Sequence, residues 1–199
     1  MNSKTAKTNN WLEIAKQVLT IEIEGLKSVL SDLDDNFSLA IDLLGRCRGR
    51  IVVTGIGKSG LVGKKIAATL SSTGSPSFFL HPVEGAHGDM GMIRPEDVVL
   101  AISNSGETDE LNAILPSLKS LGVKIIGLTS NQKSTMARFC DLIIKVKVPQ
   151  EACPLGLAPT ASTTATLAVG DAIAVCLIKL KSFGKQDFKK YHPGGFLGQ

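Results

Sequence analysis

Residues 51–60 read IVVTGIGKSG, and this stretch decides the expected fold. Its first four residues are all β-branched, as in a strand buried on both faces, and the glycines at 55, 57 and 60 suit a tight turn into a helix. Similar runs, separated by helical patterns, follow at SFFL 77–80, VVLAIS 98–103, VKIIGLT 123–129 and DLIIKV 141–146. Strands that alternate with helices predict a five-stranded parallel sheet covered on both faces, which is a doubly wound α/β fold.

Apolar residues outside the strands recur at spacings of three and four, which is the helical period. The pattern predicts an amphipathic helix over 11–33, interrupted by Glu22, and a second helix over 37–47. Further helices are expected at 59–72, 107–120, 134–139 and 160–181. The last of these is long and apolar, but its Ser and Thr residues, Gly170 and Asp171 favour a buried core helix over a membrane span.

The chain of 199 residues, 43% of them hydrophobic, is long enough for one buried core. We expect a single domain with a flexible start (1–10), two N-terminal helices (11–47), an α/β core (50–181) and a C-terminal tail (182–199). The four cysteines form no C-x-x-C pair, and no apolar segment follows the polar N-terminus. These features predict a reduced, cytoplasmic protein without a secretory signal or membrane association.

The charges of the chain favour small anions over nucleic acid as partners. The 22 basic and 18 acidic residues give a net charge of +4, and the basic residues are not gathered with aromatic neighbours. A nucleic-acid surface is therefore not expected. A weakly positive field suits small anionic substrates.

The glycine-rich turn at 55–60 is compatible with three kinds of phosphate site. A nucleoside-triphosphate P-loop would need a glycine in place of Val52, inside the strand, so that interpretation fails. The dinucleotide fingerprint G-x-G-x-x-G is satisfied, but an acidic residue should end the next strand, where the sequence has His81 and Pro82. A sugar-phosphate site is the third possibility.

A second candidate phosphate loop, SNSGET at 103–108, follows the third strand. Ser103, Ser105 and Thr108 bring three hydroxyl groups, and Asn104 an amide, to the start of the next helix, whose free N–H groups favour an anion. Ordinary helix capping by Ser105 or Thr108 is the alternative. Two loops of this kind at successive strand ends favour phosphate binding.

Few side chains in this chain could transfer protons. All three histidines lie in loops rich in Gly and Pro: His81, His87 and His192. Glu110 lies one turn into the helix after the SNSGET loop and Glu151 follows the last strand, although either could be a solvated carboxylate. Lys58 lies at a helix N-terminus, where a cation is unfavourable unless an anion is bound nearby.

Several motifs together resemble the sugar isomerase (SIS) domain family, and within it the arabinose 5-phosphate isomerases. They are GIGKSG (55–60), HPVEGAHGD (81–89), SNSGETDE (103–110), ASTTATLAVGDAIA (161–174) and YHPGGFLG (191–198). The resemblance implies a Rossmann-like fold with extra N-terminal helices. It also implies an aldose–ketose isomerase that interconverts D-ribulose 5-phosphate and D-arabinose 5-phosphate through an enediol. That reaction is the first step toward 3-deoxy-D-manno-octulosonate for lipopolysaccharide.

The resemblance also implies roles for particular residues. Lys58, Glu110, Glu151 and His192 match the family's catalytic positions, with a glutamate as the base at C1 and C2 and His192 for ring opening. The substrate-binding residues implied are Ser59, His87, Ser103, Asn104, Ser105 and Thr108. No cofactor is required. Family members can bind zinc, and His81 is the expected ligand for an ion that inhibits rather than serves the reaction.

The assembly implied by the resemblance is a homotetramer, in which His192 on the C-terminal tail reaches a neighbouring subunit's site. Longer family members continue into a tandem cystathionine-β-synthase-type regulatory module, and the sequence leaves open whether this chain is a short isomerase or a catalytic domain. Two other functions stay open, a non-catalytic sugar-phosphate sensor and a hexulose-phosphate isomerase. A hexose phosphate would need more room beyond the phosphate loop.

Overall fold

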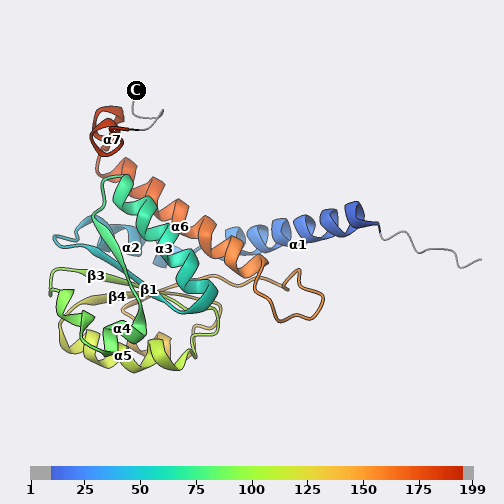
Figure 1. The fold of residues 1–199 in the computed structure, drawn as a ribbon, viewed down its shortest axis with the longest axis horizontal. Helices are drawn as coiled ribbons and strands as arrows, with labels where there is room; N and C mark the ends of the chain where they lie inside the picture. The colour runs from blue at the N-terminus through green and yellow to red at the C-terminus, as the bar shows by residue number, and fades with distance from the viewer. Residues whose placement is uncertain (1–9, 195–199) are drawn as a thin grey trace, which may run out of the picture.

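The computed structural model describes residues 10–194, so most of the expected flexible start and the end of the tail (195–199) lie outside the described residues. The strands form one parallel sheet in the order β2-β1-β3-β4-β5 (Figure 1). Their bounds are β1 Ile51–Gly55, β2 Ser77–Leu80, β3 Val98–Ile102, β4 Lys124–Thr129 and β5 Leu142–Lys145. The doubly wound, five-stranded parallel sheet is therefore confirmed.

Helices precede, connect and follow the strands. Their bounds are α1 Trp11–Asp32, α2 Asp35–Gly45, α3 Gly57–Ser72, α4 Pro82–Ala86, α5 Asp109–Ser120, α6 Ala161–Leu180 and α7 Lys185–Tyr191, with 3-10 turns η1 Asp89–Met92 and η2 Met136–Phe139. Helix α2 begins two residues before the predicted start because the Asp34 carboxylate caps it, accepting a hydrogen bond from the Asn36 amide at 3.0 Å. The sequence did not predict α4, η1 or α7, since such short segments do not show a helical period.

The sheet lies between two layers of helices, with α3 and α6 over one face and α4 and α5 over the other (Figure 1). Successive residues of β3 point to opposite faces of the sheet. Val98, Leu100 and Ile102 join the core under α3 and α6, whereas Val99 and Ala101 pack with α5. The burial of every residue in this strand explains its continuous apolar run.

Helix α6 is, among residues 10–194, the one helix that is long and apolar enough to cross a membrane by length and composition alone. Eight of its residues are buried in this fold, where it packs against α1, α2 and α3. The helix passes so close to α3 that a Cβ at Gly170 would overlap the side chain of Ile66. The prediction of a core helix over 160–181 is confirmed.

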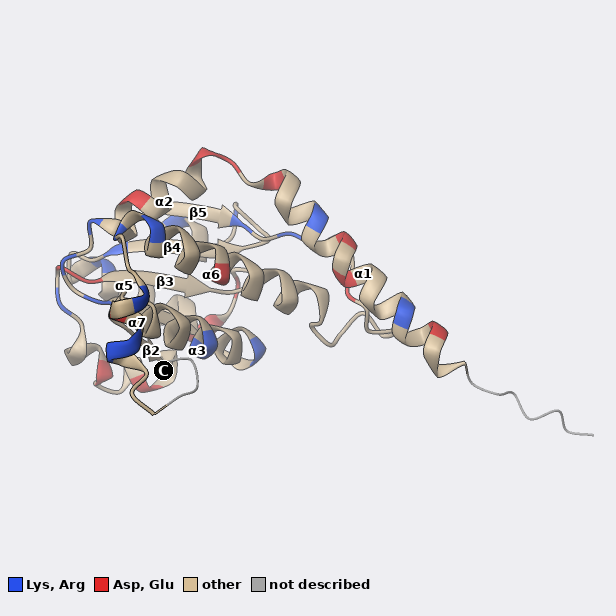
Figure 2. Ribbon diagram, turned by 90° about the horizontal axis from the view of Figure 1, so that it is seen from above, with Lys and Arg blue, Asp and Glu red and all other residues tan. Residues whose placement is uncertain are grey.

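Helix α1 lies against α6 near its own C-terminal end, and its N-terminal half projects from the body of the protein (Figure 1, Figure 2). Charged side chains of both signs are spaced along it. Its apolar side is largely uncovered, since Leu19 is 61% and Leu30 is 72% exposed. With α2 and α6 it lines an apolar cavity of about 340 Å³. Exposed apolar surface of this kind is typical of interaction surfaces.

The direction of chain winding changes between β1 and β3. From β1 the chain passes through α3 to β2 on one side of the sheet, and from β3 it passes through α5 to β4 on the other. In open α/β sheets, ligands bind in the crevice at the carboxyl ends of such strands. The GIGKSG turn follows β1 and the SNSGET loop follows β3, so the fold brings the two candidate phosphate loops together.

Candidate active site

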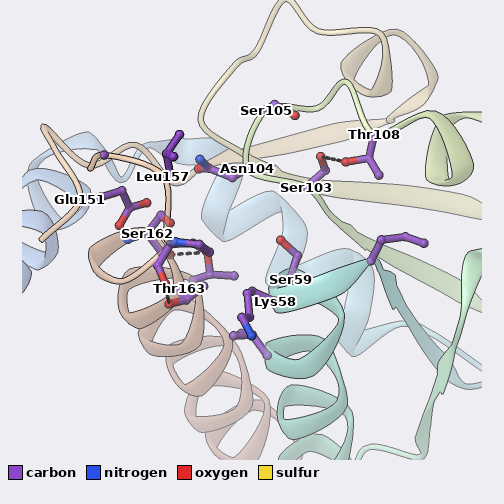
Figure 3. A pocket seen from close by; sticks show the side chains of 15 residues that line it. Lys58, Ser59, Ser103, Asn104, Ser105, Thr108, Glu151, Leu157, Ser162 and Thr163 are labelled. Atoms are coloured by element: carbon purple, nitrogen blue, oxygen red, sulfur yellow. Dashed lines mark hydrogen bonds between the residues drawn. The ribbon is translucent and has the colours of Figure 1, made fainter. Parts of the chain in front are cut away.

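A cavity of about 370 Å³ opens at the ends of β1 and β3, beside the first turns of α3, α5 and α6 (Figure 3). Seven of the predicted site residues line it: Lys58, Ser59, Ser103, Asn104, Ser105, Thr108 and Glu151. Three helix N-termini meet here, and each carries partial positive charge on its free N–H groups. The cavity is therefore suited to an anionic ligand.

The GIGKSG turn places Lys58 and Ser59 in the first turn of α3. Gly57 has a φ angle of +58°, in the left-handed region that favours glycine. Gly55 and Gly60 approach each other so closely that a Cβ on Gly60 would lie 2.8 Å from the carbonyl oxygen of Gly55. The left-handed φ angle of Gly57 and the close packing of β1 on α3 at Gly55 and Gly60 thus account for the glycines of the G-x-G-x-x-G pattern.

The SNSGET loop is held by hydrogen bonds among its own residues. The buried Ser103 Oγ lies 2.9 Å from Thr108 Oγ1 and accepts a hydrogen bond from the Gly106 amide at 3.0 Å. Ser105 Oγ accepts a hydrogen bond from the Glu107 amide at 3.1 Å. Thr108 is the N-cap residue of α5, but its side chain makes no capping hydrogen bond. The hydroxyl groups therefore leave the first amides of α5 open to a ligand.

The carboxylate of Glu151 lies at the N-terminus of α6. Its Oε2 accepts hydrogen bonds from the Thr160 amide (2.7 Å), the Thr160 hydroxyl (3.0 Å) and the Ser162 amide (3.2 Å). Burial by itself would raise the pKa of Glu151, but hydrogen bonding by Ser162 and Thr160 outweighs that effect and lowers the pKa below its ordinary value. Glu151 is therefore an anion at neutral pH.

Lys58 also lines a second cavity, of about 420 Å³, next to β2. His81 lines this second cavity and not the first. Its Nδ1 atom is buried and has no hydrogen-bond partner among residues 10–194. The Nζ atom of Lys64 lies 5.4 Å from the centre of the Phe79 ring in the same wall. Lys58 thus lies between the predicted substrate cavity and the histidine predicted to bind metal.

Besides His81, three predicted residues do not line the first cavity within one chain. Glu110 is exposed on the first turn of α5, and His87 is exposed at the end of α4. His192 follows α7, at the far end of α6 from the cavity (Figure 1). Helix α6 alone is about 30 Å long at 1.5 Å per residue. The ring of His192 stacks on the ring of Phe188, with 3.8 Å between the two ring centres. The roles of these three residues stay predictions.

Sequence reasoning missed the hydroxyl groups that α6 contributes to the cavity wall. Ser162, Thr163 and Thr166 lie in the first two turns of the helix and line the cavity (Figure 3). The prediction for 160–181 used the Ser and Thr residues of this helix only as evidence for a core helix over a membrane span, and it gave them no role in the site. The signal that could have revealed them is the cluster of Ser and Thr at the start of an otherwise apolar helix that follows the last strand.

The prediction that His81 binds zinc finds little support within a single chain. Protein zinc sites use three or four ligands from His, Cys, Asp and Glu. The part of the chain that the structure describes contains no group of three or more such residues placed to hold a metal. The unpartnered Nδ1 of His81 is one imidazole nitrogen, which does not make a zinc site by itself. We therefore derive no catalytic step through a metal.

The fold and these loops define a class of protein. The chain matches the SIS domain over residues 44–176, more than half of its length, and it belongs to this family. It is similar to the arabinose 5-phosphate isomerases KdsD of Escherichia coli (strain K12) and Yersinia pestis, with 54% identity to each over 187 residues. Those alignments cover 94% of this chain, which spans only 57% of the length of either relative.

A solved structure extends the comparison. The protein c3406 of E. coli CFT073, solved in complex with arabinose 5-phosphate, is 44% identical to this chain and superposes with a TM-score of 0.90. The match covers 97% of this chain and all of that one. The whole described fold therefore has a counterpart in a protein that binds a small sugar phosphate.

Proposed function

We propose that the chain is an aldose–ketose isomerase that interconverts D-ribulose 5-phosphate and D-arabinose 5-phosphate through an enediol. The relatives with 54% identity bear the name arabinose 5-phosphate isomerase, and the similar protein c3406 was solved with that sugar phosphate bound. A cavity of about 370 Å³ is within the roughly 300–1,000 Å³ that is usual for small-molecule sites.

One observation carries this proposal. The SNSGET loop and the carboxylate of Glu151 line the same cavity, on different elements (Figure 3). A sugar phosphate whose phosphate group binds at Ser103, Ser105 and Thr108 leaves its carbon chain within the cavity that Glu151 lines. Binding and proton transfer are thereby assigned to different parts of one site.

Isomerisation needs a base that moves one proton between C1 and C2. The base takes the proton from C2 of the aldose, the C–H electron pair forms the C1–C2 double bond, and the carbonyl oxygen at C1 takes up a proton. Return of a proton to C1 and loss of the proton on the C2 oxygen give the ketose. Glu151 is ionised and can therefore accept a proton, although its lowered pKa makes it a weaker base than an ordinary carboxylate. Glu110 is the other candidate, and Lys58 neutralises phosphate or enediolate charge.

The proposed assembly is a homotetramer with shared sites. Glu110, His87 and His192 lie outside the cavity of their own chain, which is expected if they complete the cavity of another subunit. The uncovered apolar side of α1 offers a surface for contact between subunits. In that arrangement, His192 assists ring opening of the aldose in the neighbouring site.

The proposed setting is the cytoplasm, where the product supplies 3-deoxy-D-manno-octulosonate for lipopolysaccharide. No cofactor takes part in the proposed reaction. Zinc acts as an inhibitor, held by His81 together with ligands from another subunit.

The test of the proposed reaction is incubation of the chelator-treated protein with ribulose 5-phosphate in deuterated water, followed by NMR. We expect arabinose 5-phosphate that carries solvent deuterium at C2. Binding of the sugar without product would favour the sensor, and turnover of hexulose phosphates alone would favour the other isomerase. Product without deuterium would count against an enediol whose proton exchanges with solvent.

A further inference from the structure

The hydroxyl group of Ser162 has no role in the functions assigned so far. Ser162 is the second residue of α6, it is 2% exposed, and it lines the cavity. Its Oγ atom has no hydrogen-bond partner among residues 10–194. Buried hydroxyl groups in proteins nearly always have a partner, so an orphan that borders a cavity indicates a ligand that supplies the missing bond.

The other hydroxyl groups at this end of α6 are already committed. Thr163 Oγ1 donates to the Thr160 carbonyl at 2.8 Å, and Thr166 Oγ1 donates to the Ser162 carbonyl at 2.8 Å. The Thr160 hydroxyl donates to Glu151 Oε2 at 3.0 Å. Among these four side chains, Ser162 therefore has the one hydroxyl proton that is free for a ligand.

The backbone of Ser162 places its side chain next to Glu151. Its amide donates to Glu151 Oε2 at 3.2 Å, so the residue that carries the free hydroxyl also holds the proposed base. The Ser162 hydroxyl lies near enough to the carboxylate to help lower its pKa, but it makes no hydrogen bond of proper geometry with it. The free hydroxyl is therefore a neutral donor close to the proposed base, and an oxygen on the carbon next to the reacting C–H bond is a suitable acceptor for it.

We propose that Ser162 Oγ donates a hydrogen bond to the substrate oxygen that becomes negatively charged in the enediolate. This inference rests on the proposed isomerase function. As the base removes the proton from carbon, the C–H electron pair forms the new C–C double bond and the carbonyl π electrons move to oxygen. A donor placed in advance at that oxygen stabilises the developing charge, because no reorganisation is needed when the charge appears.

The test compares Ser162→Ala with the unmodified protein and with Thr164→Val. Thr164 lies in the same turn, but its hydroxyl contacts Glu22 of α1 at 3.1 Å and does not line the cavity. We expect Ser162→Ala to lower kcat for arabinose 5-phosphate about 10- to 100-fold with KM changed less than about threefold, since the lost bond forms only as charge develops. We expect Thr164→Val to keep the kcat of the unmodified protein.

Thermal unfolding separates this role from a structural one. Removal of a buried, unpartnered hydroxyl should leave Tm unchanged or higher in Ser162→Ala. A kcat within about twofold of the unmodified protein would overturn the inference, and so would a fall in Tm that accounts for the lost activity. If the unmodified protein shows no turnover, the proposed function itself fails; if it turns over and Ser162→Ala is fully active, only the role of Ser162 fails.

Discussion

The hydroxyl oxygens of Ser103 and Thr108 lie 2.9 Å apart, which ties the end of β3 to the start of α5 across the SNSGET loop. Substitution of either residue should therefore weaken binding of the substrate's phosphate group. We expect Ser103→Ala and Thr108→Val each to raise KM for arabinose 5-phosphate about tenfold or more, because hydrogen bonds to a charged group are worth about 1.5–3 kcal/mol.

Steady-state kinetics measure this effect. Ser120→Ala is the control, since Ser120 lies at the other end of α5 and its hydroxyl donates to the Ser117 carbonyl. An unchanged KM in both loop variants would show that the phosphate group of the substrate does not bind at the SNSGET loop.

Glu151 is expected to be essential for proton transfer. Glu151→Gln keeps the shape of the side chain but removes the basic oxygen, so kcat should fall about 10²- to 10⁴-fold. The free energy of unfolding should fall by about 1 kcal/mol, because the charged cap of α6 is lost. Asp141→Asn is a matched control, since Asp141 also accepts a backbone hydrogen bond, from Ile125 at 2.9 Å, but does not line the cavity. Equal kcat values in the two variants would exclude Glu151 as the base.

The lowered pKa of Glu151 predicts an acid-dependent loss of stability. The unfolded chain binds this proton near the ordinary pKa of 4.5 and the folded chain binds it at lower pH, so the contribution is fully present above 4.5. It is lost as the pH falls through the lower folded value. Urea unfolding of the unmodified protein and Glu151→Gln should therefore give stabilities that converge below pH 4.5. A difference that grows as the pH falls would contradict this sign.

Shared sites predict complementation between two inactive variants. Lys58→Ala removes a residue that lines the cavity, whereas His192→Ala changes a residue at the far end of α6. Co-expressed, differently tagged chains should regain activity in mixed assemblies, in about a quarter of the sites if subunits pair at random. Mixed assemblies no more active than either parent would show that sites are not shared in this way.

The uncovered side of α1 predicts an effect of charge on assembly. Leu30 is 72% exposed and lines the apolar cavity that α1 forms with α2 and α6. Leu30→Glu should lower the molecular mass measured by light scattering, because a buried charge at a subunit contact is costly. Leu121→Glu, at the end of α5, is the control and should leave the mass unchanged. An unchanged mass in both variants would show that the subunits do not make contact through the apolar side of α1.

Sequence patterns predicted the sheet because a strand buried on both faces must be apolar throughout, as β3 is. They also predicted two phosphate loops, which contain Lys58 and Ser103 and line one cavity because the carboxyl ends of β1 and β3 meet where the winding changes direction. Both predictions depend on regularities that extend along several residues of one chain.

The remainder of the site depends on relationships that spacing does not encode. Ser162 lies in a helix whose apolar composition indicated only burial, and its hydroxyl group has no partner among residues 10–194. His192 matched a family motif, but its position beyond α6 is set by the length of that helix. Periodicity within a chain carries no information on which subunit a terminal residue reaches.

The close crossing of Gly170 and Ile66 fixes the spacing of two helices in the core beneath the site. Helices α3 and α6 carry facing walls of the cavity, and this contact limits how closely they approach each other. Ser162 lies about 12 Å from Gly170 along the helix axis at 1.5 Å per residue. The missing side chain at residue 170 therefore lets two helices that carry cavity walls pack directly on each other, although neither Gly170 nor Ile66 lines the cavity itself.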